Sequence, residues 1–193
     1  MEKLKKYCQS TLPFTSKELD LIDQNFKEIK LKNKEFLFKE GNICTFIGFV
    51  ESGMIRHFHV REGVEKTCDL SQENSWVTDF QSFNFACSGI MNLQALGNTT
   101  IFSIQKENLY RLYKDSPKFE TFGRIMVEKI AQRASDIAMS LSSEKPEERF
   151  KNFLQNQPNI FQLAPQKYIA NFLGISPESL SRIRKRVFDK TKS

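Results

Sequence analysis

The stretch NFLGISPESLSRIRKRVF, residues 171–188, decides how the chain folds and what it binds. Gly174 lies where a chain can reverse through a left-handed conformation, and Ser176 is a natural helix N-cap. Pro177 suits the first helical position because its missing N–H costs nothing there. Just upstream, Ala170 is small where a crossing helix must come close. The pattern therefore predicts a helix-turn-helix.

The second helix of this motif is predicted to have two chemically different faces. Leu180, Ile183 and Val187 share one face and should pack on Ile169 and Leu173 of the preceding helix. At the start of such a helix, an acid can accept from cytosine and an arginine can contact guanine, while later basic residues hold phosphates. The predicted DNA-binding residues are Ser176, Pro177, Glu178, Ser179, Ser181, Arg182, Lys185 and Arg186.

Positive charge is concentrated at this end of the chain. The 193 residues carry a net charge of +6, and residues 143–193 hold ten basic against five acidic residues, which gives +5 of that total. A basic module on a nearly neutral body favours double-stranded DNA as partner, although a solvated basic face is the simpler alternative. If about 5 to 8 phosphates are neutralised per dimer, affinity falls steeply with salt, by about 0.9 log unit per contact for each tenfold rise in salt concentration.

The rest of the chain divides into a β-rich and a helical part. Residues 1–29 are expected to be helical, with a break at Pro13. From residue 30 to 104, short β-branched and aromatic runs alternate with turn residues, which predicts an antiparallel sandwich or barrel. With 39% hydrophobic and 27% charged residues, the composition is that of a globular protein.

A long helix is predicted over residues 116–142, because apolar residues recur there at steps of three and four without a proline. This stripe could cover the chain's own β domain, but we favour a parallel seam with a second copy, which makes the protein a homodimer. The predicted dimer-interface residues are Phe119, Phe122, Met126, Ile130 and Ile137; Ala134 and Leu141 continue the stripe. Three short helices should follow, so the expected domains are 1–115, 116–142 and 143–193.

The cysteines and the hydropathy bear on the compartment. Cys8, Cys44, Cys68 and Cys87 form no C-x-x-C pair, and no signal peptide precedes them, so free thiols are expected. No apolar run approaches the roughly 18 to 20 residues that a membrane helix needs. We expect a cytoplasmic protein without a membrane partner.

The segment QKYIANFLGISPESLSRIRKRVF resembles the helix-turn-helix of the cyclic-AMP receptor protein (Crp/Fnr) family, particularly its Bacteroidetes-type branch. FLFKEGNICTFIGFVESGMIRHFHVREGVEKTCDL is similar to the first strands of that family's β-roll, and LQALGNTTIFSIQKENLYRLYKDSPKFETFGRIMVEKI to its last strands and dimer helix. The resemblance covers nearly the whole chain. It implies an α+β fold: a cyclic-nucleotide-binding-like antiparallel β-roll (a cupin-like jelly roll), a dimerisation helix and a C-terminal helix-turn-helix.

The resemblance also implies a function. A transcription regulator of this family binds a pseudo-palindromic operator as a homodimer, with RNA polymerase as a further partner. By position, Glu178 and Arg182 match the family's base-contacting acid and arginine, whereas Pro177 stands where other members carry an arginine. Many members continue into a β-wing after residue 193, so this chain should depend more on its basic helix.

The sensor's ligand is less legible. Cyclic-nucleotide-binding relatives supply a glutamate and an arginine near the end of the roll, and the matching pocket here is Asp79, Phe83, Ser88 and Gly89. No basic residue lies between Ser88 and Ile90, which argues against cAMP or cGMP because a buried phosphate needs a charged partner. The aromatic residues Trp76, Phe80, Phe83 and Phe85 would suit an unidentified apolar effector or plain core, and no cofactor is predicted.

The sequence gives less support to two kinds of metal site, an iron–sulfur cluster and a cupin-like metal centre. An iron–sulfur cluster needs several N-terminal cysteines, and only Cys8 lies there. His57 and His59 alternate on a strand near Glu62, as in a metal-binding cupin, but no third histidine exists, so we predict no metal site and no enzyme. A cupin-like metal- or small-ligand-binding protein with an incidental basic tail, and a nucleotide sensor that controls a protein partner, are the alternatives.

Overall fold

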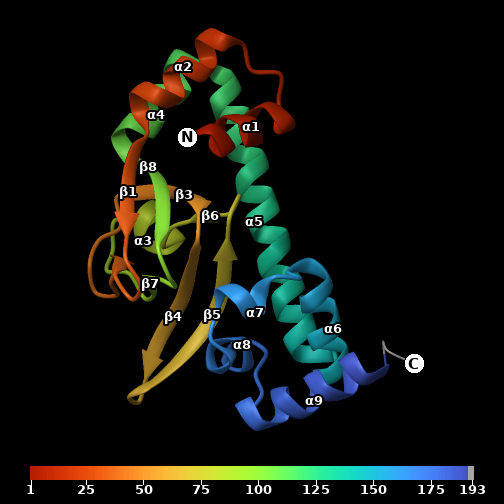
Figure 1. Ribbon diagram of the computed structural model, residues 1–193. Coiled ribbons are helices and arrows are strands. Elements are labelled where there is room, and N and C mark those ends of the chain that lie inside the picture. Colours follow the sequence, from red (N-terminus) through yellow and green to blue (C-terminus); the bar gives the residue numbers. More distant parts are fainter. Residues whose placement is uncertain (191–193) are drawn as a thin grey trace.

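The computed structural model describes residues 1–190, so the last three residues of the expected DNA-binding domain lie outside the described part. A β-roll lies beside one long helix, and a group of short helices lies against both at the far end (Figure 1). The predicted α+β fold and its order of elements are confirmed.

The roll consists of two four-stranded antiparallel sheets, which we call the sensor roll (residues 27–105). One sheet has the order β1-β8-β3-β6 and the other β2-β7-β4-β5. Their bounds are β1 Lys27–Leu31, β2 Phe36–Phe38, β3 Phe46–Ser52, β4 Met54–Arg61, β5 Val64–Gln72, β6 Trp76–Val77, β7 Asn92–Ala95 and β8 Thr99–Gln105, with the helix α3 Phe80–Phe85 between β6 and β7. The inner faces meet in an apolar core that includes Val50, Ile55, Leu93 and Ile101.

Turn residues fix the hairpin between β4 and β5. Glu62 and Gly63 both have positive φ, at 52° and 75°, which matches the type I′ turn that suits the twist of two-residue hairpins. A register shift between His57 and Phe58 leaves Cys68 of β5 without a partner on β4. β5 is the edge strand of its sheet, so its outer backbone groups need partners from elsewhere.

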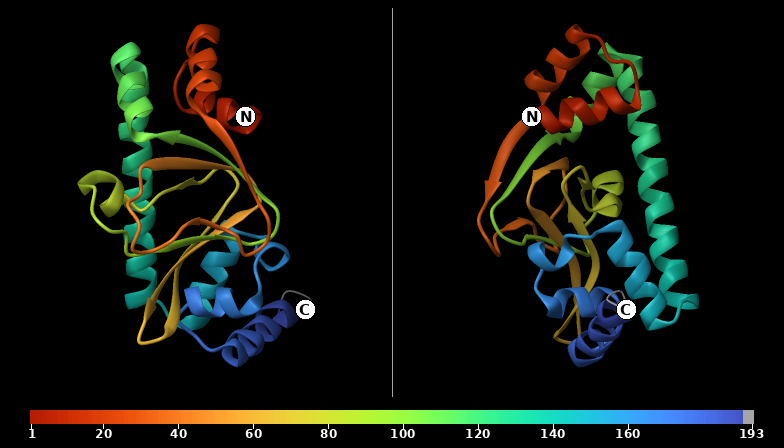
Figure 2. Two further views of the ribbon diagram at one scale, coloured as in Figure 1. Left: turned by 90° about the vertical axis from the view of Figure 1, so that its left-hand side faces the viewer. Right: turned by 45° about the vertical axis from the view of Figure 1, so that its right-hand side comes forward.

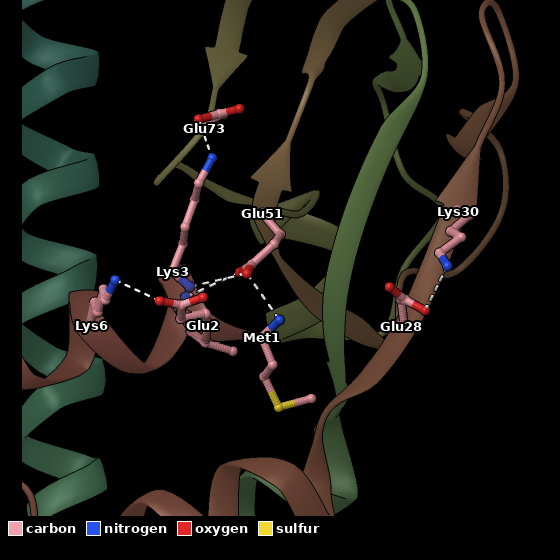
Figure 3. Close-up of polar contacts among 9 residues, drawn as sticks. Met1, Glu2, Lys3, Lys6, Glu28, Lys30, Glu51 and Glu73 are labelled. Atoms are coloured by element: carbon pink, nitrogen blue, oxygen red, sulfur yellow. Dashed lines mark hydrogen bonds and ion pairs between the residues drawn. The ribbon is translucent and has the colours of Figure 1, made fainter.

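The N-terminal helices α1 (Glu2–Thr11) and α2 (Ser16–Asn25) are shorter than the helical lead-in predicted to Ile29. Lys27–Leu31 pairs along β8 instead, because the edge of that strand offers backbone partners. Glu51 of β3 anchors α1: its carboxylate accepts from the backbone N–H groups of Lys3 (3.0 Å) and Leu4 (3.1 Å) and pairs with the Met1 ammonium (2.9 Å; Figure 3). A carboxylate there satisfies free N–H groups and complements the helix dipole.

The long helix α5 (Pro117–Ser143) follows α4 (Lys106–Asp115) and runs along the side of the roll (Figure 2). Its 27 residues span roughly 40 Å. The first half packs into a core with α1, α2 and α4 that contains Phe119, Phe122 and Met126. Gly123 lets α5 lie close against Tyr113 of α4, since a Cβ at this position would lie 2.2 Å from the Tyr113 hydroxyl oxygen.

The C-terminal helices form what we call the reader domain, residues 146–190. They are α6 (Pro146–Asn156), α7 (Ile160–Leu163), α8 (Gln166–Phe172) and α9 (Pro177–Lys190), so the three predicted helices are joined by the single turn of α7. The core of this domain is not its own alone: Met54, Leu70 and Leu96 of the sensor roll are buried in the same cluster as Phe150 and Leu173.

Candidate nucleic-acid interface and sensor cavity

The helix-turn-helix forms as its sequence predicts. Gly174 has a φ of +68°, and the N–H of Ile175 donates to the carbonyl of Ala170 at 3.0 Å, which closes the end of α8. Ala170 is fully buried where the two helices meet. The N–H of Ser179 donates to Ser176 Oγ at 3.2 Å, and Pro177 begins α9, so the predicted N-cap is confirmed.

One face of α9 is buried and holds the helix in place. Leu180 and Ile183 are buried against Ile169 and Leu173 of α8, and Val187 packs at the edge of the same cluster. Arg149 of α6 adds a clamp that sequence reasoning missed: its guanidinium donates to the carbonyl of Leu173 at 2.9 Å and to that of Glu144 at 3.0 Å. It therefore ties the turn of the motif to the end of α5.

The other face of α9 carries the predicted DNA-binding residues. Their side chains are exposed except Ser179, which is half-buried. Arg182 donates to Ser179 Oγ at 3.3 Å, and Arg186 pairs with Glu147 at 3.4 Å. The pKa of Glu178 is lowered by its own backbone N–H, by Ser176 and by Arg182, so the carboxylate is an acceptor at neutral pH. The face offers one carboxylate acceptor beside several cationic donors, which suits base edges and phosphates.

The residues predicted to form a ligand pocket instead make contacts that hold the roll together. Asp79 is buried and accepts from the N–H groups of Ser82 (3.0 Å) and Ile90 (2.9 Å), so its carboxylate caps α3. Phe83 is buried, Ser88 is exposed, and a Cβ on Gly89 would lie 2.5 Å from the Phe38 ring. The Phe38 side chain thus fills the space beside this loop.

A cavity of about 420 Å³ lies elsewhere, between the roll and α5. Its polar wall contains His57, Asp69, Ser71 and Arg133, and its apolar wall includes Trp76, Phe80, Met91, Met126 and Ile130. None of the four predicted pocket residues lines it. The sequence could not show this cavity, because its walls come from strands and a helix that are far apart along the chain.

The polar wall of the cavity is a connected network. Arg133 Nη2 and Nε donate to the two carboxylate oxygens of Asp69 at 2.6 and 3.1 Å, and Ser71 Oγ lies 3.0 Å from His57 Nε2. Burial opposes ionisation of the Asp69 carboxyl, but the hydrogen bonds and the charge of Arg133 outweigh it and lower the pKa of that carboxyl. Burial is the main cause that lowers the pKa of His57. Arg133 is thereby neutralised within the protein.

Histidine contacts do not resemble a metal site. His59 Nδ1 lies 3.1 Å from Cys68 Sγ, and His57 Nε2 is taken by Ser71. Among residues 1–190, no three histidine, cysteine, aspartate or glutamate side chains converge as metal ligands would. Within the same residues, no helix is both long and apolar enough to cross a membrane.

The predicted dimer residues divide into two groups. Phe119, Phe122 and Met126 are buried in the core of the same chain, because α1 and α4 cover that side of α5. Ile130 and Ile137 are half-buried and line the cavity. A different set of α5 residues is exposed at heptad spacing: Val127, Ala131, Ala134, Ala138 and Leu141.

A β-roll, a long helix with an exposed apolar stripe and a terminal helix-turn-helix define a class of two-domain regulators. The Anr transcriptional activator of Pseudomonas aeruginosa is 25% identical over 89% of this chain and 75% of its own. FixK2 from Bradyrhizobium japonicum superposes with a TM-score of 0.74 (15% identity, 86% of each chain). The catabolite activator protein of Thermus thermophilus gives 0.57 (18% identity, 93% of this chain and 86% of that one). No family model matches.

The predicted resemblance to the Crp/Fnr family is confirmed by these relatives and by a Crp/Fnr-family regulator from Eubacterium rectale, which superposes with a TM-score of 0.67 (17% identity, 94% of this chain and 88% of that one). The finer assignment to its Bacteroidetes-type branch stays a prediction.

Proposed function

We propose that this protein is a transcription regulator that binds a palindromic operator as a homodimer. The observation that carries the proposal is α9, whose buried face holds the helix on α8 while Glu178, Arg182 and Lys185 lie exposed on the other face. The relatives named as transcriptional activators support it, and the cupin-like enzyme is not favoured. A recognition helix presented in this way can enter the major groove.

The homodimer seam is proposed along Val127, Ala131, Ala134, Ala138 and Leu141 of α5. Val127 and Leu141 are 52% and 44% exposed, although both are large apolar side chains. The residues recur at alternating steps of four and three, the spacing of a two-stranded coiled coil. The three alanines would let the two helices approach closely.

The effector site is proposed as the cavity between the roll and α5. An apolar body would pack on Trp76, Phe80 and Met126, and a polar group would meet His57 or Ser71. A cyclic phosphate fits poorly, since Arg133 is already paired with Asp69 by two hydrogen bonds. We expect no thermal shift on addition of cAMP or cGMP. RNA polymerase, as a further partner, stays a prediction from the family.

The function is tested by selection of DNA from a random pool with the full chain, followed by affinity measurement on the recovered operator. A palindromic consensus is expected. Arg182→Ala should then weaken operator binding by about 10- to 100-fold, the value of one good base contact. Arg111→Ala on α4, which is at the opposite end of the molecule from α9 (Figure 1), is the matched control. Recovery of no consensus sequence would exclude the proposal.

A further inference from the structure

The sensor roll and the reader domain meet at an interface that contains a buried arginine. Arg56 of β4 points away from the roll interior and is 1% exposed. Its guanidinium carbon lies 4.2 Å from the ring centre of Phe58 and 3.8 Å from that of Tyr168 on α8. Arg56 Nε donates to Thr67 Oγ1 at 2.9 Å, and Nη1 pairs with Glu65 at 2.7 Å. The cation is therefore stacked between one ring from each domain.

Two further polar contacts join the same surfaces. The N–H of Thr67, on the outer edge of β5, donates to Asn171 Oδ1 of α8 at 2.5 Å. Gln157, at the end of α6, donates from Nε2 to the carbonyl of Leu70 at 3.4 Å. The reader domain thus satisfies backbone groups that the edge strand would otherwise expose.

Apolar contact supplies the rest of the interface. Met54 and Leu70 of the roll have no exposed surface, because the reader domain covers them and includes them in its core. Apolar burial is non-directional, so it holds the two domains together without fixing their relative rotation. A planar guanidinium between two rings and a side-chain amide on one backbone N–H are directional. We therefore attribute the relative orientation of the two domains to the polar contacts.

We propose that Arg56, through Tyr168, is a positioning residue for DNA binding: it fixes the orientation of the reader domain, and hence of α9, on the sensor roll. The docked arrangement leaves Glu178, Arg182 and Lys185 exposed, as DNA binding requires. In a dimer, the orientation of α9 relative to α5 sets the separation of the two recognition helices. Arg56 therefore determines which spacing of half-sites the protein accepts.

The proposal rests on the function proposed above and is tested with matched substitutions. Arg56→Met keeps the length and leaves no unpaired buried charge, since Glu65 is half exposed and can be hydrated. Tyr168→Leu removes the stacking ring, and Tyr168→Phe keeps it as the control. Wild type and variants are measured on the selected operator, on the same half-sites with the spacer changed by two base pairs, and on a single half-site.

Wild type and Tyr168→Phe should prefer the selected spacing by about tenfold or more, within the usual range of coupling between sites. Arg56→Met and Tyr168→Leu should lose most of that preference while their affinity for a single half-site stays unchanged. An unaltered spacing preference in both variants would overturn the proposal, whereas failure of wild type to select any operator would count against the function itself.

Amide exchange at Thr67 gives a readout that needs no DNA. Because Asn171 is the partner of this N–H, its protection reports docking of the reader domain. Exchange should be about tenfold faster in Arg56→Met and Tyr168→Leu than in wild type and Tyr168→Phe. Equal protection in all four proteins would refute the role of Arg56 even if no operator were recovered.

Discussion

At the scale of single residues, His57 is the clearest titratable group outside the DNA-binding face. It lies buried between the roll and α5, with Asp69 and Arg133 beside it and Asp79 within electrostatic reach. Burial is the largest influence on its pKa, and Arg133 adds to that lowering while the two carboxylates oppose it. The imidazole is therefore neutral in the folded protein at pH values where a free histidine begins to protonate.

This burial predicts acid-sensitive stability. Below a pH of about 6.5 the unfolded chain binds a proton that the folded chain does not, so the free energy of unfolding falls as the pH is lowered through that value. One such proton contributes at most about 1.4 kcal/mol per pH unit. His57→Gln keeps a partner for Ser71 and should flatten the decline, as measured by urea unfolding between pH 7.5 and 5.5.

His59→Gln is the matched control, because it removes the other histidine from a half-buried position on the same strand. It should keep most of the wild-type acid sensitivity. If His59→Gln flattened the decline and His57→Gln did not, the burial argument would be wrong.

At the scale of elements, the turn of the helix-turn-helix depends on one backbone conformation. Gly174 has a φ of +68°, and a Cβ there would lie 3.4 Å from Arg149 and 3.6 Å from Leu141, which are ordinary contact distances. Gly174→Ala should therefore destabilise the protein by about 1–2 kcal/mol through backbone strain alone. Gly174→Asn should cost less, since asparagine tolerates this region. Denaturant unfolding measures the stability of both variants. Equal stability of Gly174→Ala and Gly174→Asn would show that strain at the positive φ does not determine the loss.

The exposed stripe of α5 predicts how the dimer can be broken. Ala131→Lys places a charge in the proposed seam, on a residue that does not line the cavity, and should raise the dimer dissociation constant by about tenfold or more. Gln132→Lys adds the same charge on the same helix away from the stripe and should leave the dimer intact. Sedimentation at several protein concentrations distinguishes the two. A stable Ala131→Lys dimer would place the seam elsewhere.

The helix-turn-helix was predictable because its determinants are local. The Ser176 cap, the Gly174 turn and the spacing of Leu180, Ile183 and Val187 all act within a few residues. The long helix was predicted too, but its period did not show which apolar residues face a partner. Phe119, Phe122 and Met126 are covered by α1 and α4, and no local signal shows which distant element covers a helix face.

At the scale of the whole molecule, the sequence could not show how the domains meet. Arg56 and Tyr168 are separated by more than half of the chain, and no local pattern around either residue indicates that the two side chains meet. Asp69 and Arg133, which join the roll to α5, are 64 residues apart, and no local pattern connects them either. The cavity and the domain interface lie on opposite faces of β4 and β5, since His57 points inward and Arg56 outward. A ligand in the cavity would therefore contact the same two strands, β4 and β5, that position the reader domain.

Operator binding should depend on salt in a way that reports the α9 helices of both protomers. Each phosphate contact contributes about 0.9 to the slope of log affinity against log salt, so about 5 to 8 contacts per dimer give a slope between about −4.5 and −7.

Lys185→Ala should remove one phosphate contact per α9, which reduces the slope by about 2 per dimer and weakens all DNA sequences alike. Arg182→Ala, a base contact, should lose specificity and leave the slope nearly unchanged. Ala131→Lys, measured at a concentration where it is monomeric, should show about half the wild-type slope, because only one α9 can then engage the DNA. Anisotropy titrations at four salt concentrations measure all of these slopes. Equal slopes for wild type and Lys185→Ala would mean that α9 does not lie against the phosphate backbone.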